Sequence, residues 1–213
     1  MILYTLHENG YIDIKHVKNH KGLNVYVNLT NRCPCACTFC LRQTKQMCEE
    51  NTLWLKKEPT VEEVINEFEK YDLNQFGEVI FCGFGEPMER VFDVVKIADY
   101  LKGKRADLKT RMNTNGLGNL IHNQDITLLL KDRLDVVSIS LNAPDEKEYY
   151  ELTRSKFGIG SYNEMLKFAM LAKQYVPSVV LTVVDIIGEE KINKCQKICD
   201  DLGVTLRVRP FEE

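Results

Sequence analysis

The sequence predicts an α/β fold: a partial (β/α)6 barrel with parallel strands, preceded by a short N-terminal hairpin. Six short apolar segments with strand character alternate with amphipathic helical segments, as parallel strands joined by right-handed crossovers do. Two of these segments, Val136–Leu141 and Val179–Val184, are β-branched and almost continuously apolar, which is typical of strands buried on both faces. A closed barrel of eight units takes roughly 250 residues, whereas this chain has 213. A doubly wound open sheet is the alternative.

The first 23 residues form an extension within what we expect to be a single domain of residues 1–213. Ile2–Leu6 and Tyr11–Ile14 are predicted strands on either side of the segment His7-Glu8-Asn9-Gly10. Because Asn-Gly pairs favour the tight turns of hairpins, we expect these two strands to pair before the barrel begins.

The predicted barrel strands are short runs of apolar and β-branched residues. In parallel α/β proteins the carboxyl ends of the strands share one edge, and active sites lie there. Residues that directly follow a predicted strand are therefore the first candidates for function. The strands are Val25–Leu29, Glu78–Cys82, Lys109–Met112, Val136–Leu141, Val179–Asp185 and Thr205–Val208.

Helical segments with an apolar face of 3.6-residue period lie between these strands. A capping box of Thr60 and Glu63 begins the first of them. Ser161 and Glu164 have the same spacing at the start of another, and Gly203 ends the last at a C′-like position. The predicted helical segments are Val61–Phe68, Val91–Leu101, Ser161–Ala172 and Ile192–Leu202, with a less regular one over Ile126–Leu130.

Composition and charge argue against several classes of function. The net charge is −3, from 28 Lys and Arg against 31 Asp and Glu, so the overall charge does not favour nucleic acid or a membrane as a partner. No apolar run approaches the roughly 20 residues of a membrane span, and the N-terminus lacks the pattern of a secretory signal. Eight cysteines in such a chain favour reduced thiols, some of them on metal, and a cytoplasmic location.

The most informative motif is C-x3-C-x2-C, formed by Cys33, Cys37 and Cys40 just after the first barrel strand. Three thiolates at this spacing can hold one corner of a cubane iron–sulfur cluster, where an electron-transfer cluster uses four. The fourth iron then keeps an open position, which distinguishes a catalytic metal site from a structural one. Phe39, within the motif, could pack over the cluster or over a flat ligand, and Arg42 could offset the negative charge of the cluster.

Zinc is the alternative metal for these thiols. A structural zinc ion takes four ligands, usually two C-x2-C pairs or a mixture of Cys and His. No second pair occurs, and the four histidines lie outside the motif. Cys35 could in principle replace one of the three cysteines, but we expect it to be a non-ligand that faces away.

The other four cysteines are predicted to be bystanders, so we expect one cluster. Cys195 and Cys199 lie four residues apart on the apolar face of the last helix, where packing in the core explains them. Cys82 ends a buried strand, and Cys48 lies in a predicted loop.

A second candidate site is Gly83-Phe84-Gly85-Glu86-Pro87, which directly follows the second barrel strand. Glycines let a backbone approach a ligand closely and adopt turns that a Cβ would forbid. Exposed backbone groups in such a loop can bind a charged amine or carboxylate. Taken alone, this segment would be an ordinary strand-to-helix turn. Because it comes one β/α unit after the cysteine motif, it is a more specific indication of a binding site.

Together the two motifs resemble the radical S-adenosylmethionine (SAM) superfamily, and the resemblance covers essentially the whole chain. It implies a partial (β/α)6 barrel, one [4Fe–4S] cluster on Cys33, Cys37 and Cys40, and SAM bound to the open iron. It also implies reductive cleavage of SAM to a 5′-deoxyadenosyl radical that abstracts hydrogen from a substrate. The loop Gly83–Pro87 would contact the methionine amino group through its backbone and Glu86. Phe84 departs from the commonest pattern, which has a second Gly there.

The same resemblance implies further SAM contacts after later strands. Asn113 belongs to an Asn-Thr-Asn-Gly segment that ends the third strand, and Ser140 and Asn142 alternate onto one face of the fourth. Arg154 would clamp a carboxylate, or else pair with Glu151 at the surface. Arg207 and Arg209 would meet the substrate or close the open end of the barrel. With the adenine-side loop, the predicted SAM-binding residues are Phe39, Gly83, Phe84, Gly85, Glu86, Pro87, Asn113, Ser140, Asn142, Arg154, Asp185 and Ile187.

Within the superfamily the chain looks most like the small radical SAM proteins associated with TatD-family nucleases. Its length, the segments Asn28–Cys33 and Ser140–Pro144, and the ending Leu206–Arg209 carry this resemblance. It implies a TatD-family nuclease as a functional neighbour and an electron donor such as flavodoxin or ferredoxin.

The substrate is not named by any motif. Because little sequence follows the predicted barrel, we expect a macromolecular substrate, such as a protein, or a partner that completes the site. Activation of a glycyl-radical enzyme is the nearest alternative activity. A non-catalytic iron–sulfur module for binding or electron transfer is the alternative from another class, although it would not need the loop Gly83–Pro87.

Overall fold

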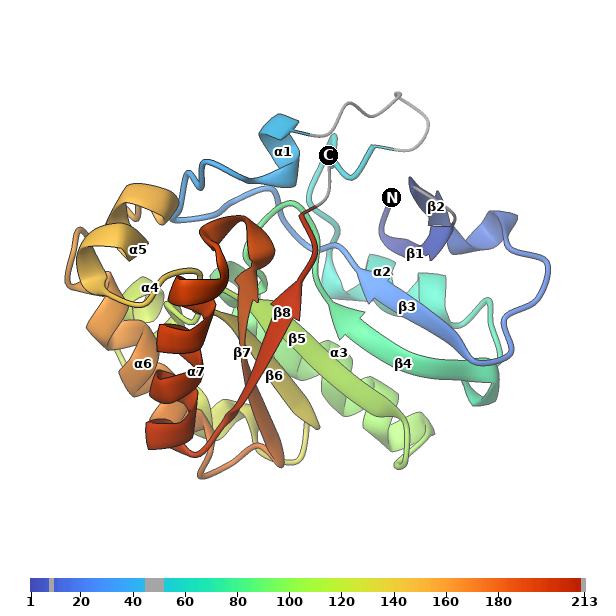
Figure 1. The fold of residues 1–213 in the computed structure, drawn as a ribbon. Coiled ribbons are helices and arrows are strands. Elements are labelled where there is room, and N and C mark those ends of the chain that lie inside the picture. Colours follow the sequence, from blue (N-terminus) through green and yellow to red (C-terminus); the bar gives the residue numbers. More distant parts are fainter. Residues whose placement is uncertain (8–9, 45–51, 212–213) are drawn as a thin grey trace.

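The computed structural model describes residues 1–7, 10–44 and 52–211. They form one eight-stranded sheet in the order β2-β1-β3-β4-β5-β6-β7-β8 (Figure 1). All neighbours from β3 to β8 are parallel, whereas β1 runs antiparallel to both β2 and β3. The strands are β1 (Leu3–His7), β2 (Gly10–Asp13), β3 (Leu23–Val27), β4 (Phe76–Phe81), β5 (Lys109–Thr114), β6 (Val136–Ser140), β7 (Ser178–Val184) and β8 (Thr205–Arg209).

The predicted α/β fold, with six parallel strands after an antiparallel hairpin, is confirmed. The Asn-Gly turn expected in the hairpin includes Asn9, which lies outside the described residues. The predicted strand Val179–Asp185 is shifted by one residue relative to β7, which ends at Val184 because Asp185 begins the 3-10 helix η6 (Asp185–Ile187).

Helices follow the parallel strands in sequence and pack on the outer face of the curved sheet (Figure 1). Alternate strand residues such as Phe81, Ile139 and Val183 share one apolar core with Ile97 of α3 and Phe168 of α6. Because these helices share one face of the sheet, the arrangement is that of a partial barrel, whereas a doubly wound sheet has helices on both faces. The α-helices are α1 (Leu41–Thr44), α2 (Val61–Phe68), α3 (Val91–Lys104), α4 (Gly118–His122), α5 (Glu146–Thr153), α6 (Ser161–Ala172) and α7 (Glu189–Leu202).

Two of the predicted helix ends are confirmed and one is wrong. The side chain of Thr60 accepts a hydrogen bond from the backbone of Glu63, and Gly203 ends α7 in the left-handed region with φ 63°. The capping box expected at Ser161 does not form. The Ser161 hydroxyl donates to the carbonyl of Gly158 at 2.6 Å, and Gly160 rather than Ser161 is the N-cap of the helix.

The fold also contains helical elements that the sequence pattern did not indicate. Helix α5 has only two buried residues, Tyr149 and Thr153, among charged ones, so its apolar period is weak. The segment Ile126–Leu130 is helical as expected, but as the 3-10 helix η5 (Thr127–Leu130). The other 3-10 helices of the described residues are η1 (Ile14–His16), η3 (Leu73–Gln75) and η4 (Pro87–Arg90). Among the described residues no helix has the length and apolar character needed to cross a membrane.

Candidate active site at the carboxyl edge of the sheet

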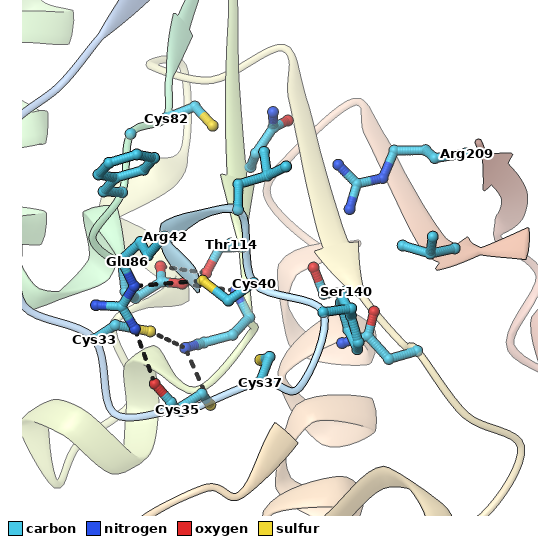
Figure 2. A pocket seen from close by; sticks show the side chains of 18 of the residues that line it. Cys33, Cys35, Cys37, Cys40, Arg42, Cys82, Glu86, Thr114, Ser140 and Arg209 are labelled. Atoms are coloured by element: carbon cyan, nitrogen blue, oxygen red, sulfur yellow. Dashed lines mark hydrogen bonds between the residues drawn. The ribbon is translucent and has the colours of Figure 1, made fainter. Parts of the chain in front are cut away.

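A cavity of about 250 Å³ lies at the carboxyl ends of the parallel strands. Its walls come from the segment after β3 that carries the cysteine motif, from the segments after β4, β5 and β6, and from the end of β8. In Figure 2 the side chains of Cys33, Cys37 and Cys40 lie together at one end of the cavity, and Cys82 and Arg209 lie at the other. The edge of the sheet predicted to carry function is therefore where the cavity lies.

The cysteine segment is irregular, and α5 holds it in place. The backbone N–H of Ala36 donates to the carbonyl of Thr153 at 2.9 Å, and that of Thr38 donates to the carbonyl of Leu152 at 2.9 Å. Both carbonyls belong to the last turn of α5, where no intrahelical partner would satisfy them. Helix α5, which the sequence pattern did not indicate, therefore supports the backbone of the cysteine motif.

All three predicted metal ligands, Cys33, Cys37 and Cys40, line the cavity. The guanidinium of Arg42 donates to the Cys40 sulfur at 3.3 Å and to the Cys35 carbonyl at 3.2 Å. The side-chain amide of Asn115 points at the sulfurs of Cys35 and Cys33, at 3.7 and 4.0 Å. Nitrogen donors aimed at sulfur stabilise thiolates, which is how proteins tune iron–sulfur sites.

Cys35 does not face away, so that expectation is wrong. It is buried, and its thiol lies between those of Cys33 and Cys37 in the same cavity. Hydrogen bonding from the Cys35 thiol holds the pKa of both neighbours below the ordinary thiol value, and the same contacts push the pKa of Cys35 far above it. Side chains alternate between two faces only in a strand, and residues 28–40 are neither helix nor strand, so neighbouring thiols of this segment can face the same cavity.

The donor set can be compared with the needs of an iron–sulfur cluster. Within residues 1–7, 10–44 and 52–211, no three His, Cys, Asp or Glu side chains converge closely enough to hold one metal ion. A cubane cluster needs one thiolate on each of three irons, so its ligands are spread around it. The chemistry of three cysteines with two nitrogen donors therefore fits an iron–sulfur cluster.

The glycines of the loop after β4 let it pack against the cysteine segment. A Cβ on Gly85 would lie 2.2 Å from the carbonyl oxygen of Thr30 and 2.7 Å from that of Arg32. The next residue, Glu86, donates its backbone N–H to the same Arg32 carbonyl at 2.7 Å. Gly83 lies against the side chain of Asn28 in a similar way and also lines the cavity.

Glu86 is buried at the end of the loop and connects two strand ends. Its carboxylate accepts hydrogen bonds from the Thr114 hydroxyl at 2.6 Å, the Asn115 N–H at 2.7 Å and the Met88 N–H at 3.0 Å. Burial raises its pKa to about 7 against the opposing effect of these donors. The carboxylate thus positions Asn115, which in turn contacts the cysteine sulfurs, and it caps η4.

Two amide side chains present unsatisfied groups at the cavity. The Oδ1 atoms of Asn113 and Asn142 are buried and have no hydrogen-bond partner among the described residues. Ser140 lines the same wall. Buried acceptors without partners are costly, so they are usually satisfied by a ligand or by water. A ligand with amine and hydroxyl groups, as SAM has, fits these acceptors.

The predicted SAM-binding residues divide into two groups. Phe39, Gly83, Phe84, Glu86, Asn113, Ser140 and Asn142 line the cavity. Five others, which are Gly85, Pro87, Arg154, Asp185 and Ile187, are absent from its wall. Gly85 and Pro87 shape the loop instead, and Ile187 packs on the main core.

Arg154 and Asp185 have other roles than lining the cavity. Arg154 is exposed and ends α5 with φ 47°, and among the described ion pairs none joins it to Glu151. The Asp185 carboxylate accepts the backbone N–H of Phe211 at 3.0 Å. It therefore fixes the segment after β8, and Phe211 itself lines the cavity.

Several cavity residues were not indicated by the motifs. Tyr4 and Tyr11 of the hairpin line the cavity and share a small apolar cluster with Leu53 and Phe84. The pairing of β1 with β3 and the contact with Phe84 bring them there, so no local pattern would have found them. Cys82 was taken for a bystander, but its thiol faces the cavity, where burial raises its pKa. Cys195 and Cys199 are buried in the core, as predicted.

Residues 27–202 match the family model described as Radical SAM superfamily. Among curated proteins, the chain is 25% identical over 183 residues to a probable dual-specificity RNA methyltransferase RlmN from Bacteroides thetaiotaomicron, covering 81% of this chain and 48% of the relative. The chain thus spans about half the length of that curated relative.

Solved structures agree on the fold. Streptococcus suis SuiB bound to its precursor peptide SuiA matches with a TM-score of 0.64 at 17% identity, over 90% of this chain and 40% of SuiB. SuiB bound to S-adenosylmethionine matches with a TM-score of 0.59 at 17% identity, over 88% of this chain and 38% of SuiB. A radical SAM methyltransferase from Sphaerobacter thermophilus matches with a TM-score of 0.58 at 14% identity, over 97% of this chain and 68% of that protein.

Proposed function

The chain belongs to the radical SAM superfamily, whose cofactors are a [4Fe–4S] cluster and SAM, and we propose that it is an enzyme that binds one cluster through Cys33, Cys37 and Cys40. When bound and reduced, the cluster supplies the electron that cleaves SAM to methionine and a 5′-deoxyadenosyl radical. Cys33, Cys37 and Cys40 would hold the cluster, and the radical derived from SAM would abstract hydrogen from a substrate that no motif of the chain identifies. The observation that carries this proposal is the convergence of the three cysteines, Asn115 and the Gly-rich loop on one cavity.

Six residues that line the cavity have roles in this proposal beside the three cysteines. Arg42 and Asn115 stabilise the thiolate charge through their N–H groups. Glu86 orients Asn115 through the backbone. The unsatisfied oxygens of Asn113 and Asn142 accept hydrogen bonds from amine or hydroxyl groups of SAM. Gly83 leaves the backbone open to SAM at the cavity wall.

The test is anaerobic reconstitution with iron and sulfide, followed by dithionite and SAM. We expect iron–sulfur absorbance, about four irons per chain, and formation of methionine and 5′-deoxyadenosine. Serine in place of Cys33, Cys37 or Cys40 removes a ligand and abolishes the cluster. Cys35→Ser keeps a hydroxyl donor toward Cys33 and Cys37, so this variant keeps the cluster.

Three outcomes would contradict the proposal. An intact cluster that yields no 5′-deoxyadenosine identifies an electron-transfer module instead. Colourless, zinc-loaded protein identifies a structural zinc site. If Cys35→Ser loses iron as Cys33→Ser does, Cys35 is a ligand and the assigned triplet is wrong. Cys199→Ala is the matched control, since Cys199 is a buried cysteine of the core away from the cavity.

We further propose that the protein belongs to the small radical SAM group associated with TatD-family nucleases. The sequence resemblance of Asn28–Cys33 and Ser140–Pro144 supports this assignment. A partner protein, an electron donor such as flavodoxin or ferredoxin, and a macromolecular substrate belong to the same proposal. Affinity capture with the reconstituted chain as bait, probed for a TatD-family nuclease, tests it; a bait that retains its cluster and captures no such nuclease counts against it.

A further inference from the structure

The concave face of the sheet carries three arginines: Arg111 on β5, and Arg207 and Arg209 on β8. On β5, Met112 packs in the helix-facing core, so its neighbour Arg111 points to the opposite face. On β8, Leu206 packs against the same core, and Arg207 and Arg209 both alternate with it. Figure 2 shows the Arg209 side chain extending from β8 toward the cavity, and Arg209 lines it.

These arginines face across the barrel rather than along one strand. Strands β5 and β8 are separated in the sheet by β6 and β7. Even so, burial first, then the charges of Arg111 and Arg209, lower the pKa of Arg207. The three guanidinium groups therefore lie in one another's electrostatic field.

One carboxylate faces this cluster. Glu78 on β4 pairs with Arg111, with 3.0 Å between Nη2 and Oε2, and the two side chains are only 16% and 20% exposed. Glu78 has a raised pKa because of burial, although Arg111 and Arg207 oppose the shift. Within the described part of the chain, Arg207 and Arg209 take part in no ion pair. Among the described residues, three arginines thus face the one carboxylate of Glu78, and two of their positive charges have no ion-pair partner there.

Two guanidinium nitrogens are also without hydrogen bonds. The Nε atoms of Arg111 and Arg209 are buried and have no partner among the described residues. A charged donor left buried and unpaired is costly. Arg207 is exposed, so water screens part of the repulsion between these like charges, but an anion that pairs with the cluster would offset the remaining cost. The fork of N–H donors on arginine matches the oxygens of a phosphate or carboxylate.

We infer that the Arg111–Arg207–Arg209 cluster binds a dianionic group of the substrate, either a phosphate monoester or a pair of carboxylates, beside the cavity. Two uncompensated positive charges match a dianion better than a single carboxylate. A phosphate monoester carries about −1.5 to −2 charges near pH 7. The inference that the anion is part of a radical-reaction substrate rests on the proposed function. The inference that the three arginines bind a dianion does not depend on it.

The experiment measures anion binding by calorimetry on the anaerobically reconstituted full chain, without SAM. Inorganic phosphate and succinate are the two probes, and the tighter binder indicates which source of the dianion the cluster prefers. Arg207→Gln and Arg209→Gln should each weaken binding roughly tenfold or more, since each removes a charged hydrogen-bond donor. Arg207→Lys should recover part of the loss.

The variant Glu78→Gln should raise the affinity for the anions, whereas the arginine variants should lower it. Removing the carboxylate leaves the cluster with a greater excess of positive charge, so both anions should bind more tightly. Misfolding would not tighten binding, so this variant keeps the inference testable if the arginine variants fold poorly. Arg133→Gln is the matched control, because Arg133 pairs with Asp99 at the surface and should leave anion binding unchanged.

The inference is overturned if neither anion binds saturably to the wild-type chain, or if Arg207→Gln and Arg133→Gln bind them equally well. Its failure is distinguishable from that of the proposed function. A chain that cleaves SAM but binds neither anion overturns the inference alone. A chain that binds phosphate through these arginines but never forms 5′-deoxyadenosine supports the anion site and overturns the radical mechanism.

Discussion

Glu86 is the residue whose chemistry links the Gly-rich loop to the cysteine sulfurs. Its carboxyl group is buried under three hydrogen-bond donors, one of which is the backbone of Asn115. Asn115 in turn directs its amide at Cys33 and Cys35. A substitution of Glu86 should therefore alter the contacts of Asn115 with the cysteine sulfurs, even if the Glu86 carboxylate does not contact SAM.

The stability of the protein should depend on pH through Glu86. Burial raises the pKa of this carboxyl from 4.5 to about 7 in the folded chain. The folded state therefore binds the proton more tightly than the unfolded state, and stability falls as pH rises. The contribution is fully present below pH 4.5 and is lost as the pH rises through about 7.

Glu86→Gln removes this dependence, because an amide does not titrate. We expect the stability of the wild type relative to Glu86→Gln to decrease with pH by at most about 1.4 kcal/mol per pH unit below neutrality, and to become constant above it. Urea unfolding over this range measures the difference. The exposed Glu62→Gln serves as the control variant. A difference between wild type and Glu86→Gln that does not vary with pH would rule out the raised pKa.

At the scale of elements, α5 matters because its last carbonyls bind the backbone of the cysteine segment. The side chain of Asp145 begins this helix by accepting the N–H of Glu148 at 2.9 Å. On α2 the equivalent residue is Thr60, which accepts the N–H of Glu63 at 3.1 Å. The two N-caps are comparable, but only α5 holds the motif.

Asp145→Ala and Thr60→Ala should therefore have similar effects on stability and different effects on the cluster. Each change removes an N-cap and costs about 1 kcal/mol of unfolding free energy. Only Asp145→Ala should lower the iron content after reconstitution or speed the loss of iron to a chelator. Equal loss of iron in both variants would show that α5 has no special role in supporting the cysteines.

At the scale of the whole molecule, one ligand site draws on distant parts of the chain. The cavity is lined by the hairpin, by the cysteine segment, by the carboxyl ends of strands β4 to β8 and by the segment after β8. A ligand that binds there contacts all of these parts at once. The unfolded chain does not bring them together, so it does not bind the ligand. Binding should therefore stabilise the fold as a whole.

SAM should raise the unfolding temperature of the reconstituted protein. At a concentration of about 100 times its dissociation constant, the gain is about 2.7 kcal/mol by mass action. The proposal has SAM on the open iron, so Cys33→Ser, which lacks the cluster, should show a much smaller shift. Thermal unfolding under anaerobic conditions measures both. An equal shift in wild type and Cys33→Ser would mean that SAM binds independently of the cluster.

The sequence predicted those features that depend on local pattern. The six parallel strands follow from apolar runs, and the ends of α2 and α7 follow from Thr60 and Gly203. The positions of Cys33 and Gly83 directly after strands placed them at the same edge of the sheet. Helix α5 was missed because most of its residues are charged, and it is fixed by tertiary contacts with the cysteine segment.

The thiolate spacing, the Gly-rich loop and the alternation of strands can be read from the sequence alone, because each is a property of neighbouring residues. Which side chains meet depends on the folded structure. In the structure Cys35 and Cys82 line the cavity, whereas Arg154 and Asp185 do not. Arg111 lies close enough to Arg207 for their charges to interact. These placements depend on how a curved sheet closes and how irregular loops pack, which brings together residues far apart in the chain.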